Sequence, residues 1–190
     1  VASYGLDARW PLAVAGTTSL LTHFVFARTP QQALGGLGWA NALTLTRLLV
    51  LFGVATFFPV AWGFALVLVL DGLDGLVARR LNESSEFGAQ FDMETDALFT
   101  ALLAATLATA APWIIVAGAL RPLYVIARAF FVETPVERRV PFARYAFGLA
   151  AWSMVAALAV GGALLAPLTV LSTLVLLVSF APDFGALRRA

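Results

Sequence analysis

The sequence contains no cysteine and only one histidine, His23. The absence of cysteine excludes disulfide bonds and thiolate metal sites, and a single histidine cannot form a histidine-rich metal site. Any metal ion that the protein binds is therefore expected to be held by oxygen atoms.

Charged residues are also scarce in this chain. Only 12% of its 190 residues are charged and 61% are hydrophobic, which leaves too few charges to cover a water-soluble globule of this size. The formal net charge is +1, and no basic patch stands out from the scattered arginines, so a nucleic-acid partner is not expected. The composition predicts an integral membrane protein.

Long apolar stretches, divided by prolines and charges, predict six membrane-spanning helices. One span needs about 20 apolar residues, and Pro59, Pro112 and Pro167 mark three turns that carry no charged residue. The expected fold is an all-α bundle of six transmembrane helices that forms one domain, residues 39–190. The expected helices are residues 41–58, 60–79, 87–110, 113–132, 142–164 and 168–181.

A further apolar segment, residues 11–27, lies in the N-terminal part of the chain, residues 1–38. It is slightly short for a span and contains several polar residues, which predicts a helix that either crosses the membrane or lies along its surface. The interfacial position is favoured because it keeps Arg9 on the same side as the other arginines. Most arginines, including Arg47 beside the first span, fall on one side of the bundle, which the positive-inside rule identifies as the cytoplasm.

Seven of the eleven acidic residues lie in one window between Asp71 and Asp96. Asp71 and Asp74 are three positions apart, and Asp92 and Asp96 are four apart, so each pair lies on one face of its helix. The polar segment between the two helices predicts that all four carboxylates converge at the cytoplasmic end of the bundle. Such a cluster needs cations, and oxygen ligands alone suit Mg²⁺ or Mn²⁺, of which four carboxylates can hold two.

Small residues share the helix faces of these aspartates. Gly75 and Ala78 follow Asp71 and Asp74 by four positions each, and Gly88 precedes Asp92 by four. Their small size leaves room for close approach of a ligand, and the adjacent arginine can pair with an anion. Carboxylates, metal ions, space and one arginine are together what a diphosphate needs. The arginine in question is Arg79, which directly follows Ala78.

The eight residues follow the spacing D-x2-D-G-x2-A-R-x8-G-x3-D-x3-D from residue 71 to residue 96. This spacing resembles the signature of the CDP-alcohol phosphotransferase (CDP-alcohol phosphatidyltransferase) family. The segment N-A-L-T-L-T-R, residues 41–47, is similar to the segment that opens the first helix of that family. The resemblance extends over residues 39–185.

The resemblance implies a transferase of phospholipid synthesis. Enzymes of this family move a phosphatidyl group from a CDP-linked donor, usually CDP-diacylglycerol, to an alcohol and release CMP. The resemblance also implies a homodimer, and we expect it in a bacterial or archaeal inner (cell) membrane with a cytoplasmic active site. It assigns metal binding to Asp71, Asp74 and Asp92, the role of general base and possible fourth metal ligand to Asp96, and CDP binding to Asp71, Asp74, Gly75, Ala78, Arg79, Gly88 and Asp92.

Arginines late in the sequence are candidates for binding an acceptor phosphate. Arg121 and Arg128 are seven positions apart, on one face of the fourth expected helix. They favour a phosphorylated polyol such as glycerol phosphate or inositol phosphate. Ala97 follows the last aspartate, where relatives that use these acceptors commonly have a basic residue, so serine, choline or another neutral alcohol stays open. The other candidates, Arg138, Arg139 and Arg144, also fit a role as membrane-flanking anchors.

Two other classes of function fit a membrane protein with clustered carboxylates. A cation or proton transporter would need polar residues along the whole depth of the bilayer, whereas the outer halves of the expected helices are apolar apart from scattered threonines and serines. A catalytically silent scaffold would not need the complete eight-residue signature. Both alternatives are therefore disfavoured.

Overall fold

The computed structural model describes residues 39–81, 86–131 and 141–187, and the described secondary structure is helical throughout. The expected N-terminal helix, residues 11–27, lies outside the described residues. The helices are α3 (Trp39–Phe57), α4 (Ala61–Leu81), α5 (Glu86–Leu107), the short 3₁₀ helix η1 (Pro112–Ile114), α6 (Ile115–Phe131), α7 (Pro141–Val160) and α8 (Gly162–Leu187).

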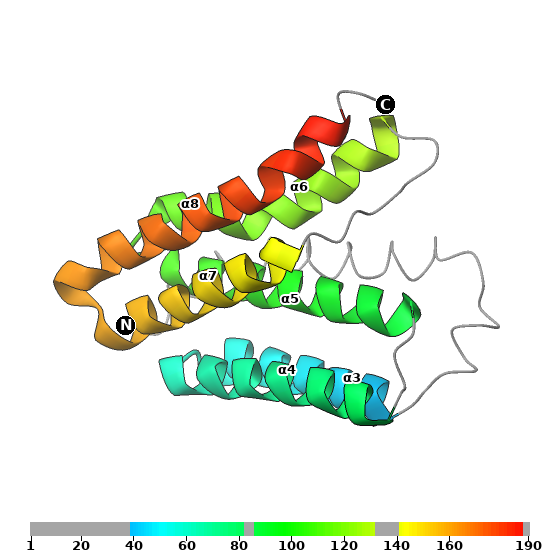
Figure 1. Ribbon diagram of the computed structural model, residues 1–190. Helices are drawn as coiled ribbons and strands as arrows, with labels where there is room; N and C mark the ends of the chain where they lie inside the picture. Colours follow the sequence, from blue (N-terminus) through cyan, green and yellow to red (C-terminus); the bar gives the residue numbers. More distant parts are fainter. Residues whose placement is uncertain (1–38, 82–85, 132–140, 188–190) are drawn as a thin grey trace.

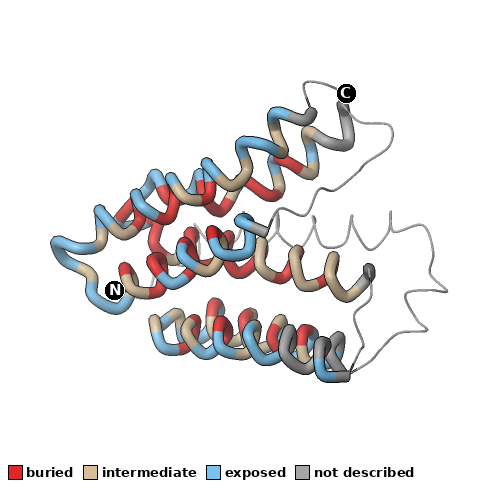
Figure 2. The backbone as a smooth tube through the Cα atoms, viewed as in Figure 1, coloured by how far each residue is buried: buried red, intermediate tan, exposed pale blue. Residues whose placement is uncertain are grey.

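The helices lie side by side in three layers (Figure 1). Helices α3 and α4 lie along one side of the bundle, α6 and α8 along the other, and α5 and α7 between them. Buried positions lie where the helices face one another, and exposed positions lie on the outer surfaces (Figure 2). The core contains Leu51, Phe64, Leu98, Leu103 and Met154, all fully buried. Helix α5 contacts α3, α6 and α7, so its side chains can reach several neighbours.

Two of the described helices are long and apolar enough to cross a membrane: Phe142–Val160 within α7 and Gly162–Gly185 within α8. Shorter apolar helices run over Ala42–Phe57, Ala61–Leu73 and Pro112–Ala127. The apolar part of α4 ends near the first aspartates, because the rest of that helix carries charged residues. The all-helical fold is confirmed, while the count of six membrane spans stays a prediction.

Pro59 lies in the turn between α3 and α4, and Pro112 begins η1 in the connection between α5 and α6, but the prediction of a turn at Pro167 was wrong. The last turn lies at Gly161 and Gly162, whose φ angles are +60° and +52°. This left-handed conformation favours glycine, which has no Cβ to clash. Helix α8 continues through Pro167, where the missing N–H removes one backbone hydrogen bond and the ring displaces the carbonyl of the residue four positions earlier. The expected helices 142–164 and 168–181 are therefore α7 and α8.

Helices α5 and α6 approach each other closely at Gly118. A Cβ atom at this position would lie 2.9 Å from the Ala104 Cβ and 3.1 Å from the Ala101 Cα. We expect Gly118→Ala to destabilise the protein by about 1–3 kcal/mol, because overpacking forces the two backbones apart. The control Gly148→Ala, where a Cβ meets nothing within 4 Å, should be neutral or stabilising by up to about 1 kcal/mol through helix propensity. Thermal unfolding in detergent measures both, and equal melting temperatures would contradict this account of α5–α6 packing.

Candidate active site

Three aspartates from two helices meet between α4 and α5. Asp71 lies on α4, and Asp92 and Asp96 lie one turn apart on α5. One carboxylate oxygen from each of the three lies within 4.8 Å of the others. All three side chains are partly exposed, so ions and small molecules can reach them. The structure thus brings together three of the four aspartates that the spacing places on facing sides of two helices.

The remaining residues of the eight-residue motif are placed less completely. The backbone of Asp74, Gly75, Ala78 and Arg79 continues α4 past Asp71, but the side chains of these positions lie outside the described residues. Gly88 lies in the first turn of α5 and is partly buried. Their proposed contacts with CDP therefore stay predictions.

A buried arginine from a third helix holds the three aspartates from the inner side of the bundle. Arg47 of α3 is 1% exposed. Its Nη2 atom lies 2.8 Å from the Asp92 Oδ1 and 3.3 Å from the Asp96 Oδ1, and its Nη1 atom forms an ion pair with the Asp71 Oδ1. A guanidinium group suits this position because its donors are arranged as a rigid fork and stay charged.

The sequence did not predict this role of Arg47, which the positive-inside pattern assigns to a flanking position on the cytoplasmic side. The signal was its position inside an apolar stretch, LTLTRLLVL, residues 43–51. A charged residue within such a stretch should face the interior of the bundle and a partner. Helix α3 packs against both α4 and α5, and that packing brings Arg47 to the carboxylates.

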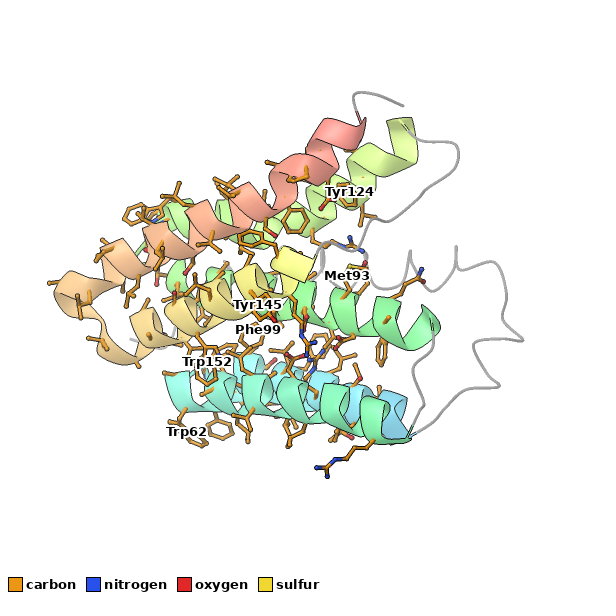
Figure 3. The ribbon with its side chains drawn as sticks, in the orientation of Figure 1. Trp62, Met93, Phe99, Tyr124, Tyr145 and Trp152 are labelled. Atoms are coloured by element: carbon orange, nitrogen blue, oxygen red, sulfur yellow. The ribbon has the colours of Figure 1, made fainter. Side chains whose placement is uncertain are left out.

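Apolar side chains pack beside the charged groups at the inner end of the carboxylate cluster. A small pocket there is lined by Arg47, Asp71 and Asp96 together with Val67, Leu68, Thr95 and Phe99. Phe99 of α5 points towards α4, where its ring meets Phe64 edge-to-face with centroids 5.8 Å apart (Figure 3). This packing closes the inner side of the site, so ligands reach the aspartates from the opposite, partly exposed side.

A second buried ion pair lies on the other side of α5. The Nε and Nη2 atoms of Arg121, on α6, donate to the Glu94 Oε1 at 3.0 and 2.5 Å. Glu94 is 3% exposed and Arg121 is 7% exposed. The Arg121 guanidinium carbon also lies 5.7 Å from the centroid of the Tyr124 ring, and Tyr124 packs against Phe184 of α8 (Figure 3).

The partner expected from the sequence for Arg121 is an acceptor phosphate, whereas the structure pairs Arg121 with Glu94. Glu94 is two positions from both Asp92 and Asp96, so it points to the other side of α5. A role for Arg121 in binding an acceptor phosphate would require this ion pair to open. Arg144, in the first turn of α7, is exposed. The side chain of Arg128, together with Arg138 and Arg139, lies outside the described residues.

Comparison with known proteins identifies the family. The family model described as CDP-alcohol phosphatidyltransferase matches residues 37–182. The chain belongs to the CDP-alcohol phosphatidyltransferase family. No curated protein and no solved structure matches the chain. The match includes the whole eight-residue motif and α3 to α7, with most of α8.

Membership of the CDP-alcohol phosphatidyltransferase family establishes the general reaction. The protein is a transferase of phospholipid biosynthesis that passes a phosphatidyl group from a CDP-linked donor to an alcohol. Enzymes of this family typically depend on a metal ion, and the three converging carboxylates are able to bind one.

The donor set fits a hard divalent cation. Two oxygens bound to one Mg²⁺ at about 2.1 Å lie at most about 4.2 Å apart. The carboxylate oxygens here lie within 4.8 Å of one another, so small side-chain rotations would let them share an ion. With no cysteine in the chain, the oxygen ligands favour Mg²⁺ or Mn²⁺ over softer metals.

Proposed function

We propose that this enzyme transfers the phosphatidyl group of CDP-diacylglycerol to an alcohol and releases CMP, with two divalent ions, Mg²⁺ or Mn²⁺, in the aspartate site. The observation that supports this proposal most directly is the convergence of Asp71, Asp92 and Asp96. In the proposal, Asp71, Asp74 and Asp92 hold the ions, and Asp96 is the general base and a further ligand.

The reaction needs a proton acceptor beside the attacking alcohol. In the proposed mechanism the hydroxyl oxygen of the acceptor forms a bond to the phosphorus that carries the lipid, and the bond from that phosphorus to CMP breaks. The Asp96 carboxylate takes the hydroxyl proton as the attack proceeds. The CMP phosphate leaves with the bonding electrons, and the chemistry supplied by bound divalent ions would be neutralisation of this developing charge.

The residues around the aspartates would bind the CDP group. Gly75, Ala78 and Gly88 leave space beside the carboxylates, and Arg79 supplies a positive charge for the diphosphate. Arg47 lies on the buried side, so the donor would approach the aspartates from the exposed side. In this proposal the reacting phosphorus would lie beside the metal-binding aspartates, with Asp96 next to the hydroxyl group of the entering acceptor.

The acceptor that we favour is a phosphorylated polyol such as glycerol phosphate or inositol phosphate. Arg144 is exposed at the start of α7 and is a candidate phosphate ligand, with Arg128, Arg138 and Arg139. Arg121 would join them only by leaving Glu94. Serine or another neutral alcohol is the alternative acceptor, because Ala97 offers no positive charge beside Asp96.

We also propose the membrane setting of the enzyme. The domain, residues 39–190, would form six spans with its site on the cytoplasmic side of a bacterial or archaeal cell membrane, as a homodimer, and residues 1–38 would add an interfacial helix. The length and apolar composition of α7 and α8 support insertion in a bilayer. Large apolar side chains on outer helix surfaces, such as Leu49, Trp62, Leu174 and Val178, are exposed, as lipid contact requires.

The direct test is CMP release by the purified protein in detergent with CDP-diacylglycerol, Mg²⁺ and a panel of alcohols. We expect CMP release that depends on both the alcohol and the metal, and complete loss of activity with EDTA, because the site offers only hard oxygen ligands. The fastest alcohol at limiting concentration identifies the acceptor. Full activity in metal-free buffer would contradict the two-ion mechanism, and no CMP release with any alcohol would contradict the proposed donor.

A further inference from the structure

Arg47 is the described cation that contacts all three converging aspartates. It comes from α3, whereas Asp71 comes from α4 and Asp92 and Asp96 come from α5. Its Nη2 atom also lies 3.4 Å from the backbone carbonyl oxygen of Asp92. One side chain therefore connects the three helices at the point where their carboxylates meet.

We propose that Arg47 is a positioning residue that aligns the three carboxylates for the divalent cation. This inference rests on the proposed metal-dependent function. Carboxylates as close as these repel one another, and their side chains are free to rotate towards water when nothing holds them. The guanidinium group of Arg47 opposes that rotation from the buried side and keeps the oxygens within the reach of one ion.

The direction of approach allows Arg47 and a metal ion to bind the same carboxylates together. Arg47 forms an ion pair with the Oδ1 atom of each aspartate. A carboxylate has two oxygens and about four lone-pair positions, so each aspartate can contact Arg47 on the buried side and a cation on the exposed side. Groups that orient metal ligands in this way typically contribute about 10–100-fold to metal affinity.

The positive charge of Arg47 has an opposing effect, because it repels a nearby cation. We expect alignment to outweigh this repulsion. Three carboxylates surround the one guanidinium group, so the cluster keeps a net negative charge with Arg47 present. Removing Arg47 increases the electrostatic attraction between the carboxylates and the ion. It also means that binding of the ion must itself order three mutually repelling carboxylates from two helices, which costs free energy.

The packing of α3 indicates that Arg47 is held firmly in place. Thr44 and Leu51 lie one turn before and one turn after Arg47 on the same face of α3, and both are buried. Leu51 is fully buried in the core, so α3 is anchored next to the guanidinium group. Leu51 also supplies a matched control, because its truncation should destabilise the same helix without removing a charge.

The test is titration of the metal-free protein with Mn²⁺, followed by the electron paramagnetic resonance signal of the free ion, for wild type, Arg47→Met, Arg47→Lys and Leu51→Ala. We expect Arg47→Met to weaken Mn²⁺ binding by about 10–100-fold. Arg47→Lys keeps the charge but not the fork, so it should weaken Mn²⁺ binding measurably, by about 3–10-fold. Leu51→Ala should lower the melting temperature and leave Mn²⁺ affinity unchanged.

The outcomes separate this inference from the proposed function. Wild type that binds no Mn²⁺ would overturn the metal-dependent mechanism and the role of Arg47 with it. Wild type that binds Mn²⁺ while Arg47→Met binds it equally or more tightly would overturn the positioning role alone. If Arg47→Met does not fold, Arg47→Lys decides: an affinity equal to that of wild type would show that the fork does not align the ligands.

Discussion

Replacement of Asp96 by asparagine should lower the turnover number by about 10²-fold or more while the protein still binds the CDP-linked donor. Asparagine has nearly the same shape as aspartate and keeps an oxygen for the contact with Arg47, which lies 3.3 Å from the Asp96 Oδ1. Its amide cannot take the proton of the acceptor hydroxyl. The measurements are the rate of CMP release at saturating substrates and the affinity for CDP-diacylglycerol at equilibrium.

Comparison of Asp96→Asn with Asp71→Asn distinguishes loss of a general base from loss of a metal ligand. Asp71 is a proposed metal ligand on α4, so its loss should weaken metal and nucleotide binding together. Asp183→Asn, on α8 outside the aspartate cluster, is the matched control and should change neither turnover nor donor binding. Equal losses of donor affinity in Asp96→Asn and Asp71→Asn would show that Asp96 acts chiefly as a metal ligand.

The sequence predicted the helices well where their ends carry a local chemical signal. Pro59 and Pro112 end apolar runs; in the structure Pro59 lies between α3 and α4, and Pro112 begins η1, the short helix between α5 and α6. The turn between α7 and α8 was misplaced because Pro167 was given more weight than the glycine pair at 161 and 162. A proline near the start of a helix disturbs few hydrogen bonds, whereas two consecutive positive φ angles require residues such as glycine.

The site was predicted in part for a similar reason. Helical spacing alone places Asp92 and Asp96 on one face of α5, and the motif connects that face with Asp71. The partners of these charges depend on which helices pack together, and spacing along one helix does not contain that information. Arg47 is 45 positions from Asp92 and Arg121 is 27 positions from Glu94, so both ion pairs depend on the tertiary fold.

The Glu94–Arg121 ion pair should have a large effect on stability. Either Glu94→Leu or Arg121→Met alone leaves one charge buried without its partner, and the expected loss is about 3–5 kcal/mol. The double variant removes both charges and fills the same space with apolar atoms, so it should recover most of that loss. Arg144→Met is the matched control, because Arg144 is exposed and its replacement should change stability by less than about 0.5 kcal/mol.

The double variant also separates the two roles considered for Arg121. Thermal unfolding and folding yield in detergent give the stability cycle, and single variants as stable as wild type would contradict a paired, buried role. With folding restored, the double variant should keep the KM for CDP-diacylglycerol, because the pair lies on the side of α5 away from Asp92 and Asp96. If the KM for the acceptor is also unchanged in the double variant, the Glu94–Arg121 ion pair has only a structural role. A KM raised for the acceptor alone would show that Arg121 leaves Glu94 to bind the acceptor phosphate, because loss of packing between α5 and α6 would affect both substrates.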